Sequence, residues 1–191
     1  MRNSTKYLVA ILLLIASGSA LAHPGHNVSG FAAGLTHPFS GLDHLLAMVA
    51  VGLWAAQRGG RKIWLLPAAF MTMLVAGAAL AMHWQSLPMV EAGIASSVLA
   101  LGLLVALSAQ LPVALSIAIT GLFGLLHGYA HGLELPESAA PLDYAAGFLI
   151  ATASLHLAGI AVGVATQRRY ALLSRILGSA IALAGTYLLV T

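Results

Sequence analysis

The chain alternates long apolar runs with short polar connections. An α-helix needs about 20 apolar residues to cross a bilayer core of about 30 Å. On this criterion we predict spans at 40–57, 63–83, 91–109, 112–131, 142–166 and 170–190. Because the connections are short, the pattern predicts an all-α membrane protein, with residues 23–191 forming one bundle of six transmembrane helices.

The region 28–57 is too long for one straight span. Pro38 disfavours helical backbone at His37, and Ser40 offers a new helix start. We therefore expect a short amphipathic or re-entrant piece at about 28–36, then a break, then the first span. Broken backbone at membrane depth requires surrounding protein or a water-filled cavity, and it is typical of transporter sites.

The first 22 residues resemble a cleavable secretory signal peptide. Arg2 and Lys6 precede an apolar run over 7–16, and an A-x-A cleavage site ends at Ala22. Cleavage would make His23 the mature N-terminus, outside the cytoplasm. An uncleaved first helix is the alternative, and it leaves the remaining topology unchanged.

The basic residues of the mature chain predict its orientation. They fall in two connections on one side of the predicted bundle: Arg58, Arg61, Lys62, Arg168, Arg169 and Arg175. Basic connections stay cytoplasmic. The chain is therefore expected to be a multi-pass protein of the bacterial inner membrane, with both mature termini periplasmic.

Composition supports this class and narrows the chemistry. The chain is 60% hydrophobic and 7% charged, whereas a soluble domain carries about 25% charged residues. The absence of cysteine excludes disulfides, thiolate metal sites and thiol catalysis. The net charge of +3 is not clustered as a nucleic-acid footprint would be. Eight histidines against five acidic residues are the unusual feature.

One histidine cluster lies at the start of the first predicted span. His37, Asp43 and His44 stand there as candidate metal ligands. Asp43 has an alternative role, because Ser40 followed three residues later by an acid is a capping-box pattern. That alternative does not account for the two imidazoles.

A second cluster ends the fourth predicted span. Spacings of four and three residues place His127, His131 and Glu134 on one helical face. Imidazoles with a carboxylate suit a divalent transition metal. Histidines hydrogen-bonded to backbone at the membrane interface are the alternative. Because both clusters face the periplasmic side, we expect them to form one site.

The other ionisable residues are accessory candidates. His83, Glu91 and Asp143 are expected on the periplasmic side. Glu137 is on the same side, where an acid in that position more often has no functional role. His156 lies 13 residues beyond Asp143, about 20 Å deeper at 1.5 Å per residue. It is either a relay toward the cytoplasm or a core histidine bonded to a neighbouring Ser or Thr.

The mature N-terminus adds a weak recruiting site. The α-amine and imidazole of His23 can chelate a metal together, with His26 within reach. These ligands suit nickel, cobalt, zinc or iron(II) better than copper(I). No phosphate-binding loop is present, so we expect no ATPase activity in the chain. The residues alone predict uptake of a divalent metal, without a tightly bound cofactor.

The stretch HPFSGLDHLLAMVAVGLWA, the early HPGH and the later HGYAHGLE resemble the HupE/UreJ family of nickel permeases. The resemblance covers the whole mature chain. It implies uptake of nickel, or cobalt in some members, for hydrogenase or urease maturation, with zinc or iron less favoured. His37, Asp43 and His44 match the first motif, and His127, His131 and Glu134 match the second.

Two other functions remain open. An intramembrane zinc hydrolase could use the same His and Asp residues, with Ser40 or Ser154 as a polar partner. Axial haem ligation by histidine pairs is the other. Membrane lipid and the metal ion are the expected partners, nucleic acid is not, and assembly into a homo-oligomer is left open.

Overall fold

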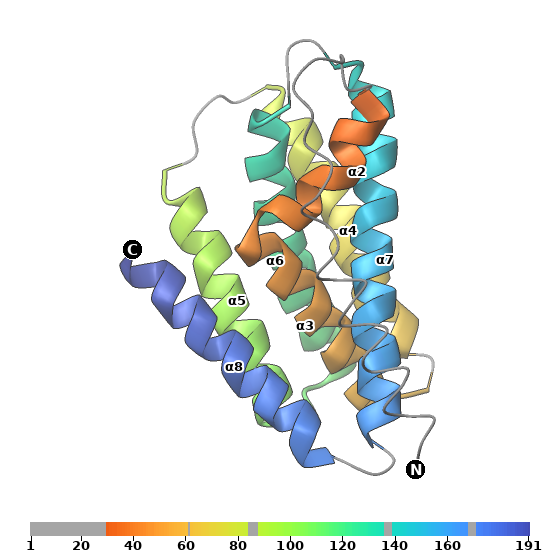
Figure 1. The fold of residues 1–191 in the computed structure, drawn as a ribbon, viewed down its shortest axis with the longest axis vertical. Coiled ribbons are helices and arrows are strands. Elements are labelled where there is room, and N and C mark those ends of the chain that lie inside the picture. Colours follow the sequence, from red (N-terminus) through yellow and green to blue (C-terminus); the bar gives the residue numbers. More distant parts are fainter. Residues whose placement is uncertain (1–29, 61, 84–87, 136–138, 168–170) are drawn as a thin grey trace, which may run out of the picture.

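The computed structural model describes residues 30–60, 62–83, 88–135, 139–167 and 171–191. These residues form an entirely helical structure (Figure 1). Its helices are α2 (Gly30–Ser40), α3 (Leu42–Arg58), α4 (Lys62–Ala81), α5 (Val90–Ala106), α6 (Val113–Leu133), α7 (Pro141–Gln167) and α8 (Ala171–Val190). The proposed signal peptide, His23, His26 and Glu137 lie outside the described residues.

Helices α3 to α8 coincide with the six predicted apolar runs. Four of them, α4, α6, α7 and α8, are each long and apolar enough to cross a membrane. The bent pair α2 and α3 meets the same criterion when taken together, whereas α5 is apolar but has 17 residues. The all-helical membrane class is confirmed, and the count of six spans stays a prediction.

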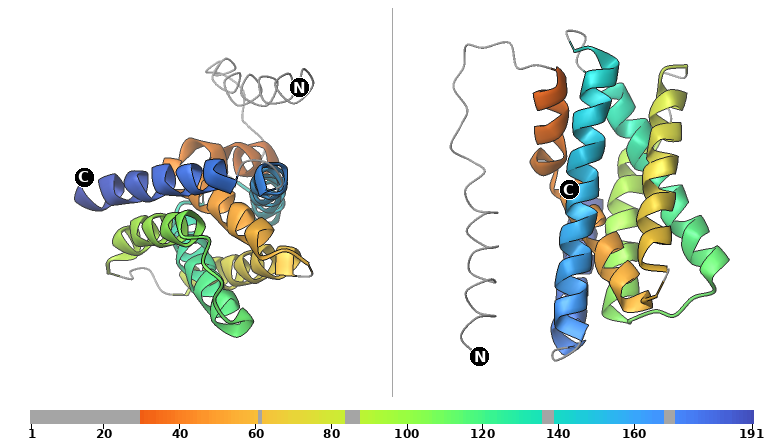
Figure 2. Two further views of the ribbon diagram at one scale, coloured as in Figure 1. Left: turned by 90° about the horizontal axis from the view of Figure 1, so that it is seen from below. Right: turned by 90° about the vertical axis from the view of Figure 1, so that its right-hand side faces the viewer.

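The bundle has two ends, with the connections divided between them. The C-terminal ends of α3 and α7 lie at the lower end in Figure 1, and the C-terminal end of α6 lies at the upper end. The principal packed pairs are α4 with α6, α5 with α8, and α7 with both α2 and α3 (Figure 2). The connections predicted to be cytoplasmic are therefore at a common end.

Close backbone approach between helices depends on glycine. A Cβ on Gly128 of α6 would overlap the Leu74 carbonyl of α4, and a Cβ on Gly34 of α2 would overlap the Tyr144 carbonyl of α7. Helices surrounded by lipid gain little from hiding apolar side chains, so van der Waals packing at small residues holds them together. These contacts fix the helices that carry the histidine clusters.

The break between α2 and α3 differs from the prediction. We expected the first helical piece to end before His37, but α2 continues through Pro38 to Ser40. Packing of α2 along α7 overrides the local preference of the residue before a proline. The chain then turns at Gly41, whose backbone is extended, and α3 departs at an angle of 80°.

The capping box considered as an alternative role for Asp43 is also absent. The Ser40 hydroxyl donates to the His37 carbonyl at 2.6 Å, because Ser40 ends α2 rather than starting α3. The N-cap of α3 is Gly41, whose carbonyl accepts from the Leu45 amide. The Asp43 carboxylate accepts from the His44 amide at 2.7 Å, which is its contact in the first turn of α3.

The two pieces follow α7 in succession. Gly34 of α2 lies against Tyr144, and Gly52 of α3 lies against the His156 carbonyl one helical stretch further along α7. The pair thus runs beside α7 as two pieces in succession, and the break between α2 and α3 falls part-way along α7 (Figure 2). His37 and His44, on either side of the break, lie beside Phe148, part-way along α7.

We predict that Gly128→Ala destabilises the protein by about 1–3 kcal/mol, because the new methyl group meets backbone that cannot rotate away. Gly121→Ala on the same helix is the matched control. Its methyl group would meet the flexible Met73 side chain at 3.2 Å, and improved helix propensity offsets that contact. Thermal unfolding in detergent measures both, and equal midpoints for the two variants would contradict the packing argument.

Candidate metal centre

Three ligand atoms from two helices converge beside the break. His37 Nε2 of α2 lies 3.0 Å from His131 Nδ1 of α6 and 3.0 Å from Glu134 Oε2, just beyond the end of α6. The His131 Nδ1 to Glu134 Oε2 distance is 2.8 Å. Among the described residues, these three form the group that could hold a metal ion.

The near-equal separations favour a particular coordination geometry. With metal–ligand bonds of about 2.1 Å, mutually cis octahedral ligands lie about 3.0 Å apart, and tetrahedral ligands about 3.4 Å apart. A square-planar ion would need one of the three pairs at about 4.2 Å. The three separations match the spacing of ligands that are cis to one another, so two imidazoles and one carboxylate could hold a single divalent ion.

His131 links the residues of this centre, which consists of His37, His131 and Glu134, because both of its ring nitrogens have partners. Its Nε2 lies 2.9 Å from His44 Nδ1, while its Nδ1 faces Glu134 and His37. If the Nε2–H donates to His44, the Nδ1 lone pair of a neutral ring points at a carboxylate oxygen. A proton or a metal cation must then lie between them.

The carboxylate is held in its charged form. Hydrogen bonds from His131 and then His37 keep the pKa of Glu134 well below its usual range, against the opposing effect of partial burial. The Glu134 side chain is half exposed. The centre therefore offers an ionised oxygen ligand at its accessible edge.

The remaining residues of the first motif have different positions. His44 is fully buried and contacts His131, and its Nε2 lies 3.4 Å from the Thr152 hydroxyl. In this position His44 can orient the His131 ring for a metal ion held at the other ring nitrogen of His131. Asp43 is outside the three-atom group and bonds the His44 amide.

His127 and His156 lie deeper in the bundle. His127 is fully buried, with its ring centroid 5.4 Å from that of His44 and 5.5 Å from that of Phe70. The His156 ring is 5.3 Å from the same Phe70 ring. We expected His156 to stand apart from the other histidines, but the Phe70 ring packs against both His156 and His127 and so links His156 to the buried end of the cluster.

The other accessory candidates are not brought into the cluster. His83 is exposed beyond the end of α4, and Glu91 and Asp143 are exposed in the first turns of α5 and α7. Their places at helix ends agree with an interfacial position. An acid in a first turn also interacts favourably with the helix dipole.

Aromatic residues of α7 line the histidines, and they were not among the predicted site residues. The Phe148 ring lies 5.8, 5.0 and 5.1 Å from the rings of His37, His44 and His131. Tyr144, one turn earlier, lies 5.9 Å from His37. Their four-residue spacing places them on one helical face, but only tertiary packing directs that face at imidazoles.

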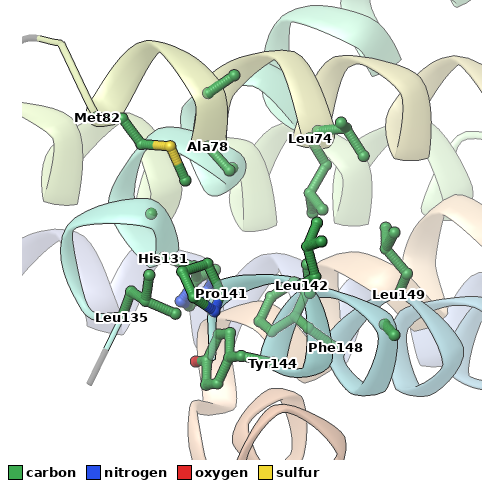
Figure 3. A pocket seen from close by; sticks show the side chains of 16 residues that line it. Leu74, Ala78, Met82, His131, Leu135, Pro141, Leu142, Tyr144, Phe148 and Leu149 are labelled. Atoms are coloured by element: carbon green, nitrogen blue, oxygen red, sulfur yellow. The ribbon is translucent and has the colours of Figure 1, made fainter. Parts of the chain in front are cut away.

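A cavity of about 450 Å³ opens beside His131, between α4, α6 and α7 (Figure 3). Leu74 and Ala78 contribute from α4, Met82 from the turn after it, and Phe148 and Leu149 from α7. Because this lining is almost wholly hydrocarbon, the cavity offers a cation little beyond His131 itself. The row of histidines, and not this cavity, offers a metal ion further ligands.

Comparison with known proteins identifies the family of this chain. Residues 11–188 match the family model described as HupE / UreJ protein. The chain belongs to the HupE/UreJ family. It is 44% identical over 189 residues to Protein HupE of Rhizobium leguminosarum bv. viciae, covering 97% of this chain and 98% of that protein. No solved structure matches the chain significantly.

Family membership confirms the resemblance drawn from the two histidine motifs. It also establishes the chain as a multi-pass membrane protein, in agreement with its apolar helices. The match extends almost from end to end of the relative.

We predict that purified protein binds Co²⁺ or Ni²⁺ and that Glu134→Gln lowers the affinity at least about tenfold, since the ionised ligand is lost. Asp143→Asn is the control, because it removes an exposed acid outside the group. Equilibrium dialysis of the protein in nanodiscs measures the affinity. Equal losses in the two variants would show a general surface-charge effect instead of a centre at Glu134.

Proposed function

We propose that this chain is a permease that carries a divalent transition-metal cation, nickel first and cobalt second, from the periplasm to the cytoplasm. HupE/UreJ proteins are accessory transport proteins, associated with nickel and cobalt transport for hydrogenase and urease. The observation that supports the proposal is that ligand atoms of His37, His131 and Glu134 lie close enough together to hold one metal ion.

The donor set suits capture of such a cation from water. Imidazole and carboxylate bind borderline divalent ions, whereas copper(I) prefers thiolate and thioether ligands. Three protein ligands on one face leave the other positions hydrated, so the ion need not lose its whole water shell on entry. The single carboxylate offsets part of the cation's charge where solvent still reaches it.

The distribution of charge supports the proposed direction of transport. The connections after α3 and α7 carry the basic residues that the positive-inside rule assigns to the cytoplasm. Glu134 follows α6 at the opposite end of the bundle. The centre then faces the periplasm, and inward movement follows α7 toward the basic end.

The broken span supplies the flexibility that transport needs. His37 is on α2, whereas His131 and Glu134 are held by α6, so the ligands belong to two independently packed helices. A small rotation of α2 about Gly41 would separate His37 from the other two ligands and open the centre. Broken helices at binding sites are the recurring device for such motion.

We predict that vesicles containing the protein take up ⁶³Ni²⁺ and that His131→Ala lowers uptake at least about tenfold, because the ring contacts every other ligand of the centre. His83→Ala is the matched control, since it removes an exposed histidine away from the group. Uptake is measured with the metal supplied outside and a chelator trapped inside.

Three outcomes separate the hypotheses. Loss of uptake in His131→Ala but not in His83→Ala supports the centre. Unchanged uptake in both variants would remove the centre from the transport path. No uptake of nickel or cobalt by the unmodified protein would contradict the permease function itself.

A further inference from the structure

A series of polar contacts leads from the metal centre to a threonine of α7. His131 Nε2 lies 2.9 Å from His44 Nδ1, and the other ring nitrogen of His44 lies 3.4 Å from the Thr152 hydroxyl oxygen. The His44 and Thr152 side chains are both fully buried. Within the described part of the chain, this hydroxyl is the hydrogen-bonding group that faces His44 Nε2. The series therefore joins α6, α3 and α7.

The Thr152 hydroxyl is placed differently from those of two other buried threonines. Thr120 and Thr166 donate to the carbonyl four residues earlier in their own helix, at 2.7 and 2.8 Å. Threonine in a helix often makes this bond. The Thr152 hydroxyl instead lies against an imidazole of another helix. Its contact with His44 is therefore a product of tertiary packing and not of the local helix.

Without a metal ion, the protons of this series are directed toward Glu134. The ionised Glu134 oxygen, 2.8 Å from His131 Nδ1, can only accept, so a neutral His131 carries its proton there. The lone pair on His131 Nε2 then accepts from the Nδ1–H of His44. Because burial penalises the charged form of an imidazole, His44 is also neutral. Its Nε2 is then an acceptor, and the Thr152 hydroxyl donates to it.

A metal ion at the centre reverses these hydrogen bonds. The ion takes the Nδ1 lone pair of His131, so the proton of that neutral ring is on Nε2 and is donated to His44 Nδ1. His44 then has its own proton on Nε2, and the Thr152 hydroxyl must accept it. The two rings hold two protons in both forms, and the hydroxyl only rotates. Its O–H can then donate to the backbone of α7, as that of Thr166 does.

We propose that Thr152 is a positioning residue of the metal centre, because its hydroxyl accommodates both forms of His44 and so lets His131 present Nδ1 to the ion. A hydroxyl group can both donate and accept, whereas a methyl group of similar shape can do neither. The inference rests on the proposed function, since it takes His131 as a ligand of the transported divalent cation.

Loss of this hydroxyl affects the metal-bound form more than the metal-free form. With metal bound, the buried Nε2–H of His44 would have no acceptor, and a buried N–H without a partner is rare and costly. Without metal, His44 Nε2 would carry only an unused lone pair. The bundle already contains such atoms, because the Nε2 atoms of His127 and His156 are buried without a partner among the described residues. Removal of the hydroxyl should therefore weaken metal binding.

This role is tested with Thr152→Val, which removes the hydroxyl and keeps the shape, and with Thr152→Ser, which keeps the hydroxyl. Thr166→Val is the matched control, because Thr166 is buried on the same helix and bonds its own backbone. Equilibrium dialysis of the full-length protein in nanodiscs measures the affinity for Co²⁺. Thr152→Val should lower this affinity at least about tenfold, whereas Thr152→Ser and the control should stay within about twofold of the unmodified protein.

A second measurement follows the His44 ring directly and needs no variant of Thr152. The ¹⁵N NMR spectrum of histidine-labelled protein distinguishes a proton on Nδ1 from one on Nε2, and the spectrum of His44→Gln identifies the signals of His44. Addition of diamagnetic Zn²⁺ to the unmodified protein should move the His44 proton from Nδ1 to Nε2.

Other results would overturn the inference. Equal affinities of Thr152→Val and Thr166→Val would show that Thr152 only fills space in the core. Equal losses in Thr152→Val and Thr152→Ser would assign the effect to packing and not to the hydroxyl, and an unchanged His44 ring on addition of Zn²⁺ would exclude the reversal. Binding of Co²⁺ without nickel transport by the unmodified protein is a different result, because it contradicts the permease function and not the role of Thr152.

Discussion

Direct contact between helix backbones is the constraint on which this structure depends. In a bilayer, apolar side chains are satisfied by lipid, so the helices need close packing to stay together. Gly128 admits the α4 backbone to α6, and Gly34 admits the α7 backbone to α2. These contacts set the distance between the helices that carry His131 and His37, and hence whether their ring nitrogens can meet.

The broken span turns this packing into a site. A straight helix through residues 30–58 would present its polar side chains along one line. The turn at Gly41 instead lets α2 place His37 beside Glu134, while α3 places His44 beneath His131. Both contacts join on one ring, that of His131, which links the accessible carboxylate to the buried histidines. Its central position follows from the four-residue spacing with His127 and the three-residue spacing with Glu134.

Burial and charge change together along the histidine series. At the half-exposed end, an ionised carboxylate and two imidazoles offer a charged, partly hydrated coordination sphere. Further in, neutral rings are packed against Phe70 and Phe148. Ionised groups are costly inside a membrane, so a protein that moves cations through it does better with neutral ligands there than with carboxylates. The aromatic rings limit the space and keep the imidazoles in fixed orientations.

The sequence by itself determined the membrane class, the positions of helices α3 to α8 and the two histidine motifs, because apolar run length and helical spacing are local properties. The sequence also identifies the family, because each of the two family motifs is a continuous stretch of residues. It could not predict that α2 continues through Pro38, since packing against α7 outweighs the preference of one residue. It also could not show that Asp43 lies outside the three-atom group, or that Phe70 and Phe148 pack against the imidazoles. Which nitrogen and oxygen atoms meet, and how deep they lie, depends on the 80° turn and on backbone contacts between distant helices, which only the tertiary structure decides.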